Sequence, residues 1–338
     1  MDYYRGKVLE VLDEGVTYDE FTQLDLPYQK VKAELDTGAV VVVEYGDVYG
    51  LQSEQLVQAG DAVVIVESVG SAGLQYSIID HYRLPWLGLI VGVFIVAVII
   101  CTRWRGVGAL VSVAISLLVL VKWLVPQLLH TDYPLLLTFS TLVVVAIITF
   151  YLGHGTSSQT TLALVCTILA LGLAMGTASF ATWLLDLSGT GSEAALSLKY
   201  GFGQDVQLSG LLLAGLLIGA LGILDDVTTA QVQAVHEFKQ SDPSLTWQQL
   251  FKKAYRIGRA HIVSLVNTLL LVYAGTALPA FAVLSTYSAQ PLWVVFNSET
   301  LMEEMIQMFV GSFTLVLAVP LTTVIAAWWF SGEHRRRT

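Results

Sequence analysis

The spacing of apolar residues changes once along the chain, close to Arg83. Before that point, apolar residues form short Val-rich runs that alternate in part with polar ones, a pattern that predicts β-strands. Glycine-containing turns such as Gly46-Asp47, Gly50 and Gly60-Asp61 separate the runs. The pattern predicts a small β-rich domain over residues 1–82, with an OB-like barrel as one candidate. The five expected strands are 7–12, 29–35, 39–45, 61–67 and 74–80.

Long apolar stretches follow Arg83, and a helix needs about 20 apolar residues to cross a bilayer. Residues 83–331 therefore predict a polytopic α-helical transmembrane bundle of about seven spans. Within it, segment 240–258 has apolar residues at helical spacing and Ser244 as a candidate N-cap. The segment is predicted to form an amphipathic helix on the cytoplasmic membrane surface. Residues 332–338 are predicted to form a basic tail. The expected spans are 84–102, 107–128, 134–153, 160–184, 207–229, 263–286 and 306–330.

Composition and charge agree with this division. Charged residues make up 13% of the chain and the mean hydropathy is +0.67, whereas soluble domains carry about 25% charged residues. We therefore expect the lipid bilayer to surround most of the chain. Residues 1–82 contain 15 acidic and four basic residues. That acidic surface opposes contact with phosphate backbones, so we expect no nucleic-acid partner.

Lysine and arginine in the loops predict the orientation. The basic residues at 103–105, 239–259 and 335–337 fall on one side, which places the C-terminus in the cytoplasm and the N-terminal domain outside. Because a folded domain does not usually cross a membrane without an upstream signal, we expect an anchor helix before Met1 in the natural gene. An even number of spans, with the acidic domain inside, is the alternative.

Two adjacent carboxylates, Asp225 and Asp226, end the apolar run of the fifth span, where charge is costly. Residues three or four apart share a helix face, so Asp226 is predicted to face a tightly packed neighbouring helix. Asp225 shares another face with Thr228. Two carboxylates this close suit proton or cation binding, although the pair could instead mark the cytoplasmic membrane boundary. The stripe of Asp226 also contains Gly215, Gly219, Gly222, Thr229 and Gln233.

The sixth span carries a second polar cluster, formed by His261, Ser264, Asn267 and Thr268. An amide in hydrocarbon needs a partner, and Asp226 or Thr229 is the expected partner of Asn267. Ordinary interhelical hydrogen bonding is the alternative interpretation.

Other features carry less chemistry. Gly172 and Gly176 predict a helix-packing seam, and His154, in the polar stretch 152–161, is expected to be an ordinary loop residue. The chain contains no HExxH, GxSxG or paired-cysteine motif, so we expect neither an enzyme nor a bound metal or cofactor.

Two segments resemble the YibE/F family of bacterial membrane proteins: Gly219–Glu237 (GALGILDDVTTAQVQAVHE) and Arg256–Pro279 (RIGRAHIVSLVNTLLLVYAGTALP). The resemblance implies an N-terminal anchor, an extracytoplasmic domain and a helical bundle in the bacterial cell membrane, but no particular activity. The pattern of an acidic residue on a helix before a cytoplasmic stretch is also similar to that of the SecD/SecF membrane core, where the acid carries protons.

These features favour a secondary transporter or proton- or cation-coupled permease that uses Asp225 and Asp226 with Thr229 and Asn267. The alternative is a non-catalytic membrane scaffold or accessory subunit whose outer domain docks a partner. A homo-oligomer, or pairing with a paralogous membrane subunit, is expected in either case.

Overall fold

The computed structural model describes residues 2–19, 24–45, 56–70, 73–202, 206–285 and 291–333. The expected turns at Gly46-Asp47 and Gly50 and the last arginines of the tail lie outside these ranges. The chain forms two compact units, Met1–Ala97 and Val98–Thr338, and each is described by itself.

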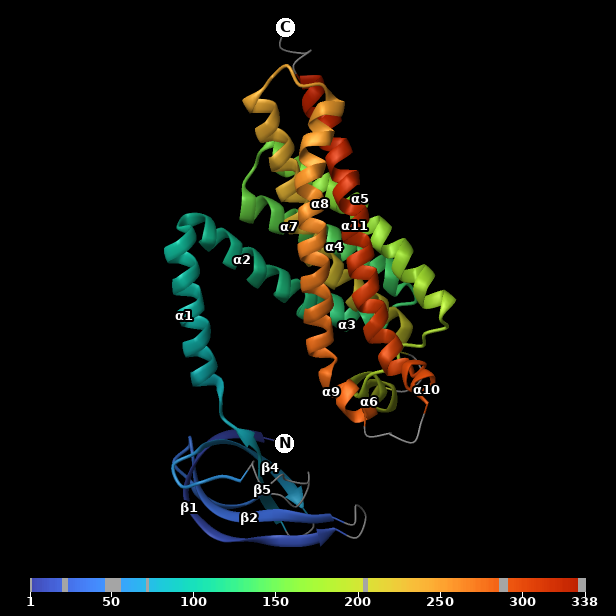
Figure 1. Cartoon of the computed structure of the whole chain (residues 1–338). Helices are drawn as coiled ribbons and strands as arrows, with labels where there is room; N and C mark the ends of the chain where they lie inside the picture. Colours follow the sequence, from blue (N-terminus) through green and yellow to red (C-terminus); the bar gives the residue numbers. More distant parts are fainter. Residues whose placement is uncertain are drawn as a thin grey trace. The chain divides into compact units, whose positions relative to one another are not determined.

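The first unit begins with a closed five-stranded barrel in the order β1-β2-β3-β5-β4 (Figure 1). Neighbouring strands are antiparallel except for β3 and β5, which are parallel. The expected β-rich domain is confirmed, and a closed five-stranded barrel fits the OB-like candidate. The strands are β1 (Asp2–Asp19), β2 (Leu24–Leu35), β3 (Val40–Tyr45), β4 (Ala62–Gly70) and β5 (Gly73–His81).

Alternation of side chains along the strands builds the interior of the barrel. Gln29 is the buried polar residue of this core: its amide accepts a hydrogen bond from Val57 N at 2.8 Å and donates to Val57 O at 3.2 Å. Gly60 has φ +101°, which favours glycine in the predicted Gly60-Asp61 turn. The buried apolar residues are Val8, Val31, Ala33, Leu35, Val43, Tyr45, Val57, Val63, Ile65 and Ile78.

Within the described ranges, seven helices are long and apolar enough to cross a membrane, as predicted. They are α1 (Leu84–Thr102), α2 (Trp104–Val119) with its continuation to Leu128, α4 (Pro134–His154), α5 (Ser158–Leu184), α7 (Leu208–Ser241), α8 (Trp247–Thr276) and α11 (Glu299–Glu333). A π-helical turn (Leu120–Leu124) joins α2 to α3 (Val125–Leu128). Three short helices complete the list: α6 (Glu193–Phe202), α9 (Leu278–Ser285) and α10 (Leu292–Phe296).

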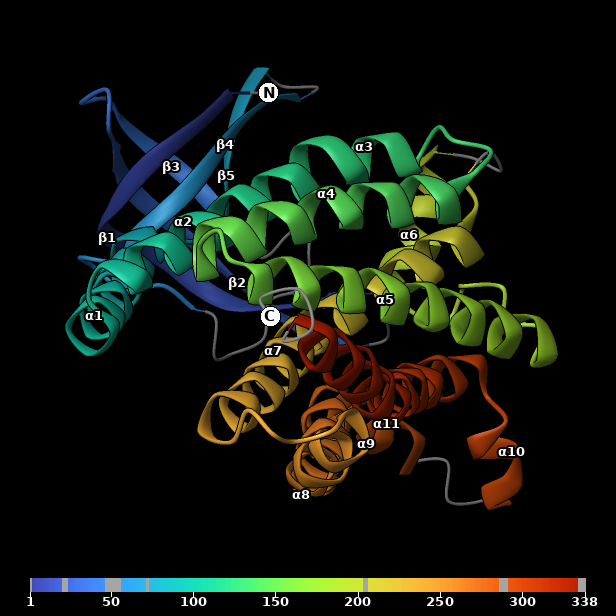
Figure 2. The ribbon, with the colours of Figure 1, turned by 90° about the horizontal axis from the view of Figure 1, so that it is seen from above.

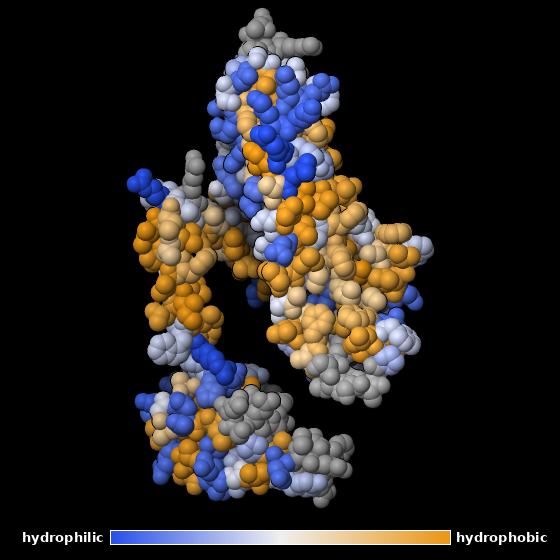
Figure 3. All heavy atoms as spheres, viewed as in Figure 1, coloured by the Kyte–Doolittle hydropathy of each residue, from blue (hydrophilic) through white to orange (hydrophobic). Residues whose placement is uncertain are grey.

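Helices α5, α7 and α11 pack against one another at the centre of the second unit, with α4 on one side and α8 on the other (Figure 2). Their shared core contains the fully buried Leu171, Leu217 and Leu224. Figure 3 shows hydrophobic residues over the middle of this bundle and hydrophilic residues around the end where α7 meets α8. That distribution matches a bundle that crosses a bilayer and extends beyond it.

Segment 240–258 differs from the expectation of a separate surface helix. Helix α7 continues to Ser241, and α8 begins at Trp247 and runs without a break into the sixth span. The N-cap of α8 is Thr246, which forms a capping box with Gln249. The prediction of Ser244 as the N-cap was therefore wrong. Leu250 and Ala254 are fully buried in the main core, so the apolar face of this segment packs on protein.

Candidate proton- or cation-binding site

Helix α7 positions both acidic residues, and the structure reverses their expected orientation. Asp225 is half-buried, while Asp226 is exposed. The leucine-rich face of α7 packs on α5 and α11, and Gly222, Asp226 and Gln233 on the opposite stripe are exposed. The prediction that Asp226 faces a packed neighbour was therefore wrong, and Asp225 occupies the interhelical position.

Asp225 lies beside His154, the last residue of α4. The distance from Asp225 Oδ1 to His154 Nε2 is 3.7 Å, and the two side chains are 21% and 39% exposed. His154 also packs on the ring of Phe150, one turn earlier in the same helix. His154 therefore belongs to a helix end and contacts an acid, which contradicts its interpretation as an ordinary loop residue.

The Oδ1 atom of Asp225 is buried and has no hydrogen-bond partner among the described residues. At 3.7 Å the histidine lies beyond hydrogen-bond distance. Buried polar atoms are normally satisfied, and exceptions often occur at functional sites or where water or an ion binds. Asp225 Oδ1 is therefore suited to hold a proton, a water molecule or a cation.

Two buried threonine hydroxyls meet in the interface of α5 and α7. Thr228 Oγ1 is 2.6 Å from Thr167 Oγ1, and both side chains are fully buried. Thr228 Oγ1 also donates to the carbonyl of Asp225 at 3.4 Å, and the buried Thr229 Oγ1 has no partner in the described part of the chain. The paired hydroxyls of Thr167 and Thr228 therefore link α5 to the backbone of α7 at Asp225.

Other predicted site residues do not join this cluster. Gln233 is exposed, whereas Gln231, which the sequence analysis missed, is buried and donates to Ala254 O of α8 at 2.9 Å. Gln231 lies three residues after Thr228, on the buried face of α7, and that spacing was the signal that could have identified it.

The polar cluster of the sixth span faces away from the core of the bundle. His261, Ser264, Asn267 and Thr268 are all exposed. Thr268 Oγ1 donates to its own helix, at Ser264 O, and the structure shows no hydrogen bond from Asn267 to Asp226 or Thr229. The expected pairing of Asn267 with the acidic helix was therefore wrong.

The predicted glycine seams are open in this chain. No described atom lies within 4 Å of a Cβ built at Gly215, Gly222, Gly172 or Gly176, and Gly219 has only the hydroxyl of Tyr273, at 3.2 Å. Close helix approach occurs instead at Gly108 and Gly258, which were not singled out. A Cβ at Gly108 would overlap the Leu152 carbonyl oxygen, and one at Gly258 would overlap Val319.

A further group of polar residues, which the sequence analysis missed, ties α11 to the loop after α5. The carboxylate of Glu299 accepts hydrogen bonds from Ser188 N at 2.6 Å, Gly189 N at 3.1 Å and Thr190 Oγ1 at 3.0 Å. Glu303 accepts another from Gly191 N at 2.9 Å. Because every one of these bonds is internal to the chain, the cluster serves to hold the loop. No group of three or more metal-ligating side chains occurs within the described ranges.

Together, these observations define a polytopic helical membrane protein with an N-terminal β-barrel and one half-buried carboxylate at an interhelical polar cluster. The family model described as YibE/F-like protein matches residues 90–332, so the chain belongs to this family. The resemblance of the two segments in α7 and α8 is thereby confirmed. No curated protein and no solved structure matches the chain.

Proposed function

We propose that the chain is a proton- or cation-coupled membrane transporter in which Asp225 is the coupling carboxylate. The single observation that supports this role is the buried Oδ1 of Asp225, which lacks a hydrogen-bond partner among the described residues. An ionisable group inside a helical bundle is costly and commonly belongs to a proton or ion pathway.

In this proposal the residues around Asp225 have different roles. His154 is the partner that exchanges a proton or shares a cation with Asp225, since it is the titratable side chain that the structure places next to Oδ1. Thr228 and Thr167 hold α7 and α5 together beside this position through their paired hydroxyls. Asp226 and Asn267, which are exposed, have no part in the proposed step.

A separate observation favours the alternative of a scaffold or accessory subunit. The outward faces of α7 and α8 carry Asp226, Ser264 and Asn267, and polar side chains in transmembrane helices usually face protein rather than lipid. A second membrane chain, either another copy or a paralogous subunit, would cover them. In this alternative, Asp226→Asn lowers the recovery of the assembly and Asp225→Asn leaves ion movement unchanged.

The experiment compares Asp225→Asn with Asp226→Asn, because both remove one charge from neighbouring positions of α7. The purified chain is placed in liposomes that contain a pH-sensitive dye, and proton movement is followed after imposing gradients of Na⁺, K⁺, Mg²⁺ or Ca²⁺. Labelling of carboxyl groups by a membrane-soluble carbodiimide is measured in parallel. We expect Asp225→Asn to reduce proton movement to the level of protein-free liposomes and to lower carbodiimide labelling below that of the wild-type chain.

Asp226→Asn is the matched control and should retain wild-type proton movement and wild-type labelling. Equal behaviour of the two variants and the wild-type chain in both assays would overturn the proposal. A loss confined to Asp226→Asn would assign the role to the exposed acid instead.

A further inference from the structure

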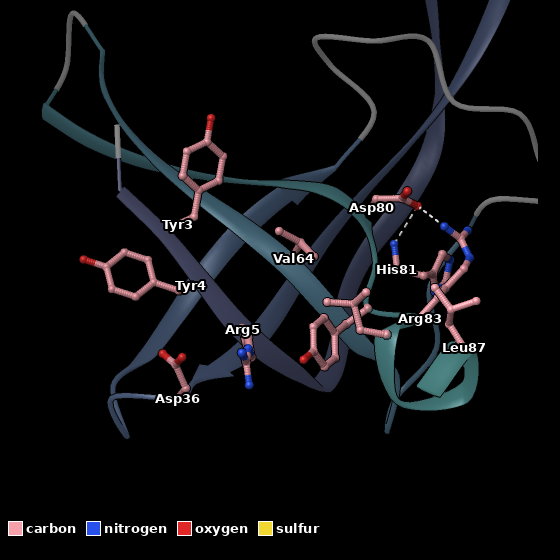
Figure 4. Close-up of a pocket in the computed structure, with 11 residues that line it drawn as sticks. Tyr3, Tyr4, Arg5, Asp36, Val64, Asp80, His81, Arg83 and Leu87 are labelled. Carbon is pink, nitrogen blue, oxygen red and sulfur yellow. Dashed lines mark hydrogen bonds and ion pairs between the residues drawn. The ribbon is translucent and has the colours of Figure 1, made fainter. Parts of the chain in front are cut away.

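A pocket of 610 Å³ lies on the barrel beside the first turns of α1 (Figure 4). Its volume falls in the range of about 300–1,000 Å³ that is usual for small-molecule sites. All of its lining belongs to the first unit, so the pocket does not depend on how the two units are arranged. The lining residues are Tyr3, Tyr4, Arg5, Asp36, Val64, Asp80, His81, Tyr82, Arg83, Leu84 and Leu87.

The pocket brings together two arginines and two carboxylates. Arg5, one of the four Lys and Arg residues of 1–82, and the adjoining Arg83 line it together with Asp36 and Asp80. Arg83 Nη1 is 2.6 Å from Asp80 Oδ1, an oxygen that also accepts from His81 N at 2.7 Å (Figure 4). Asp80 therefore fixes Arg83 at the rim of the pocket.

Arg5 differs from Arg83 because it forms no ion pair within the part of the chain that the structure describes. Its guanidinium carbon lies 5.1 Å from the centre of the Tyr82 ring, an arrangement that holds the group by cation–π attraction. Stacking leaves the edge of the guanidinium fork free to donate hydrogen bonds, and that fork matches the oxygens of a phosphate.

The pocket also has an apolar part, where the chain enters the first candidate span. Leu84 is the first residue of α1, a span with a mean hydropathy of 2.8, and Leu87 follows one turn later. Trp86, between them, is 71% exposed. Aromatic residues at a helix end mark the level of lipid headgroups, so a phosphate ligand at this depth would have acyl chains beside it.

We propose that this pocket binds the headgroup of an anionic phospholipid, with the phosphate on Arg5 and the first acyl carbons along Leu84 and Leu87. The reason is the combination of a stacked arginine, a fixed second arginine and two leucines at the bilayer surface. Soluble phosphate would use the arginines but not the leucines, so the two sources of phosphate are separable by experiment.

The test measures ligand binding to the full chain in detergent. Dioctanoyl phosphatidylglycerol, dioctanoyl phosphatidylcholine and inorganic phosphate are titrated separately, and binding is followed by native mass spectrometry. We expect phosphatidylglycerol to bind most tightly. Arg5→Gln should raise its dissociation constant roughly tenfold, because one charge-assisted contact is lost. Arg5→Lys keeps the charge but loses the fork, so its dissociation constant should lie between those of the wild-type chain and Arg5→Gln.

Lys32→Gln is the matched control, since it removes one exposed barrel cation that does not line the pocket. It should leave the dissociation constant of phosphatidylglycerol unchanged. Circular dichroism spectra that match the wild-type spectrum show that the variants fold. Equal weakening by Lys32→Gln and Arg5→Gln, or equal binding of phosphatidylcholine, would overturn the proposal. Inorganic phosphate that binds as tightly as the lipid would also overturn it, in favour of a soluble ligand.

Discussion

Asp80 accepts two hydrogen bonds in the barrel, from Arg83 Nη1 and from His81 N. Partial burial alone would raise the pKa of this carboxyl group, but the hydrogen bonds and the charge of Arg83 outweigh it and hold the pKa below its ordinary value of about 4. A carboxyl group with a lowered folded-state pKa stabilises the fold above its unfolded-state pKa. It loses that contribution as the pH falls through the folded-state pKa.

We therefore predict a pH-dependent effect of Asp80→Asn. The variant should unfold at a lower temperature than the wild-type chain at neutral pH, and the difference should shrink as the pH falls below about 4, where the wild-type carboxyl group becomes protonated. The measurement is thermal unfolding of the full chain in detergent over a pH series. Glu10→Gln is the control because Glu10 is an exposed acid of β1. A difference that stays constant with pH would contradict the prediction.

At the scale of single residues, the sequence identified which helix carries the acids but not which acid faces the protein. Glycines and Asp226 share a stripe, and small residues often mark helix contacts. The opposite stripe, with Leu217 and Leu224, is the one that packs on α5 and α11. Leucine packs equally well on lipid and on protein, so spacing alone does not distinguish the two faces. His154 was missed because it is the last residue of its helix.

Among elements, α2 and α4 approach each other closely at Gly108. A Cβ at this position would overlap the carbonyl oxygen of Leu152, which is backbone and has little room to move. We predict that Gly108→Ala destabilises the bundle by about 1–3 kcal/mol, the usual cost of overpacking. Thermal unfolding of the chain in detergent measures this effect.

Gly222→Ala provides the comparison, because it makes the same change inside a helix where no described atom lies within 4 Å of the new Cβ. Alanine favours helix over glycine by about 1 kcal/mol, so this variant should be as stable as the wild-type chain or more stable. If Gly222→Ala were as destabilising as Gly108→Ala, the close approach of α2 and α4 would not be the cause.

The elements themselves were readable in the sequence because length and apolar spacing fix them. Seven apolar stretches became seven candidate spans, and the five expected short runs became five strands. Segment 240–258 was misinterpreted for a physical reason. An amphipathic period is the same whether the apolar face lies on lipid or on a neighbouring helix, and here Leu250 and Ala254 pack into the main core.

The orientation of the whole molecule in the membrane remains a prediction from charge. Basic residues gather near the end of α7, at Lys239, and in the first half of α8, where Lys252, Lys253, Arg256 and Arg259 are exposed. Cytoplasmic loops carry such an excess of positive charge. With seven spans, this pattern predicts that the start of α8 is cytoplasmic and the barrel extracytoplasmic.

Cysteine labelling in intact cells tests this orientation with two single-cysteine variants. Both are made after replacing Cys101 and Cys166 by alanine. Ala59→Cys lies in an exposed turn of the barrel, and Gln248→Cys in the exposed first turn of α8. We expect a membrane-impermeant maleimide to label position 59 in intact cells and position 248 only after permeabilisation. The reverse result would place the barrel in the cytoplasm. The barrel and the start of α8 are separated by an odd number of spans, so they cannot lie on the same side.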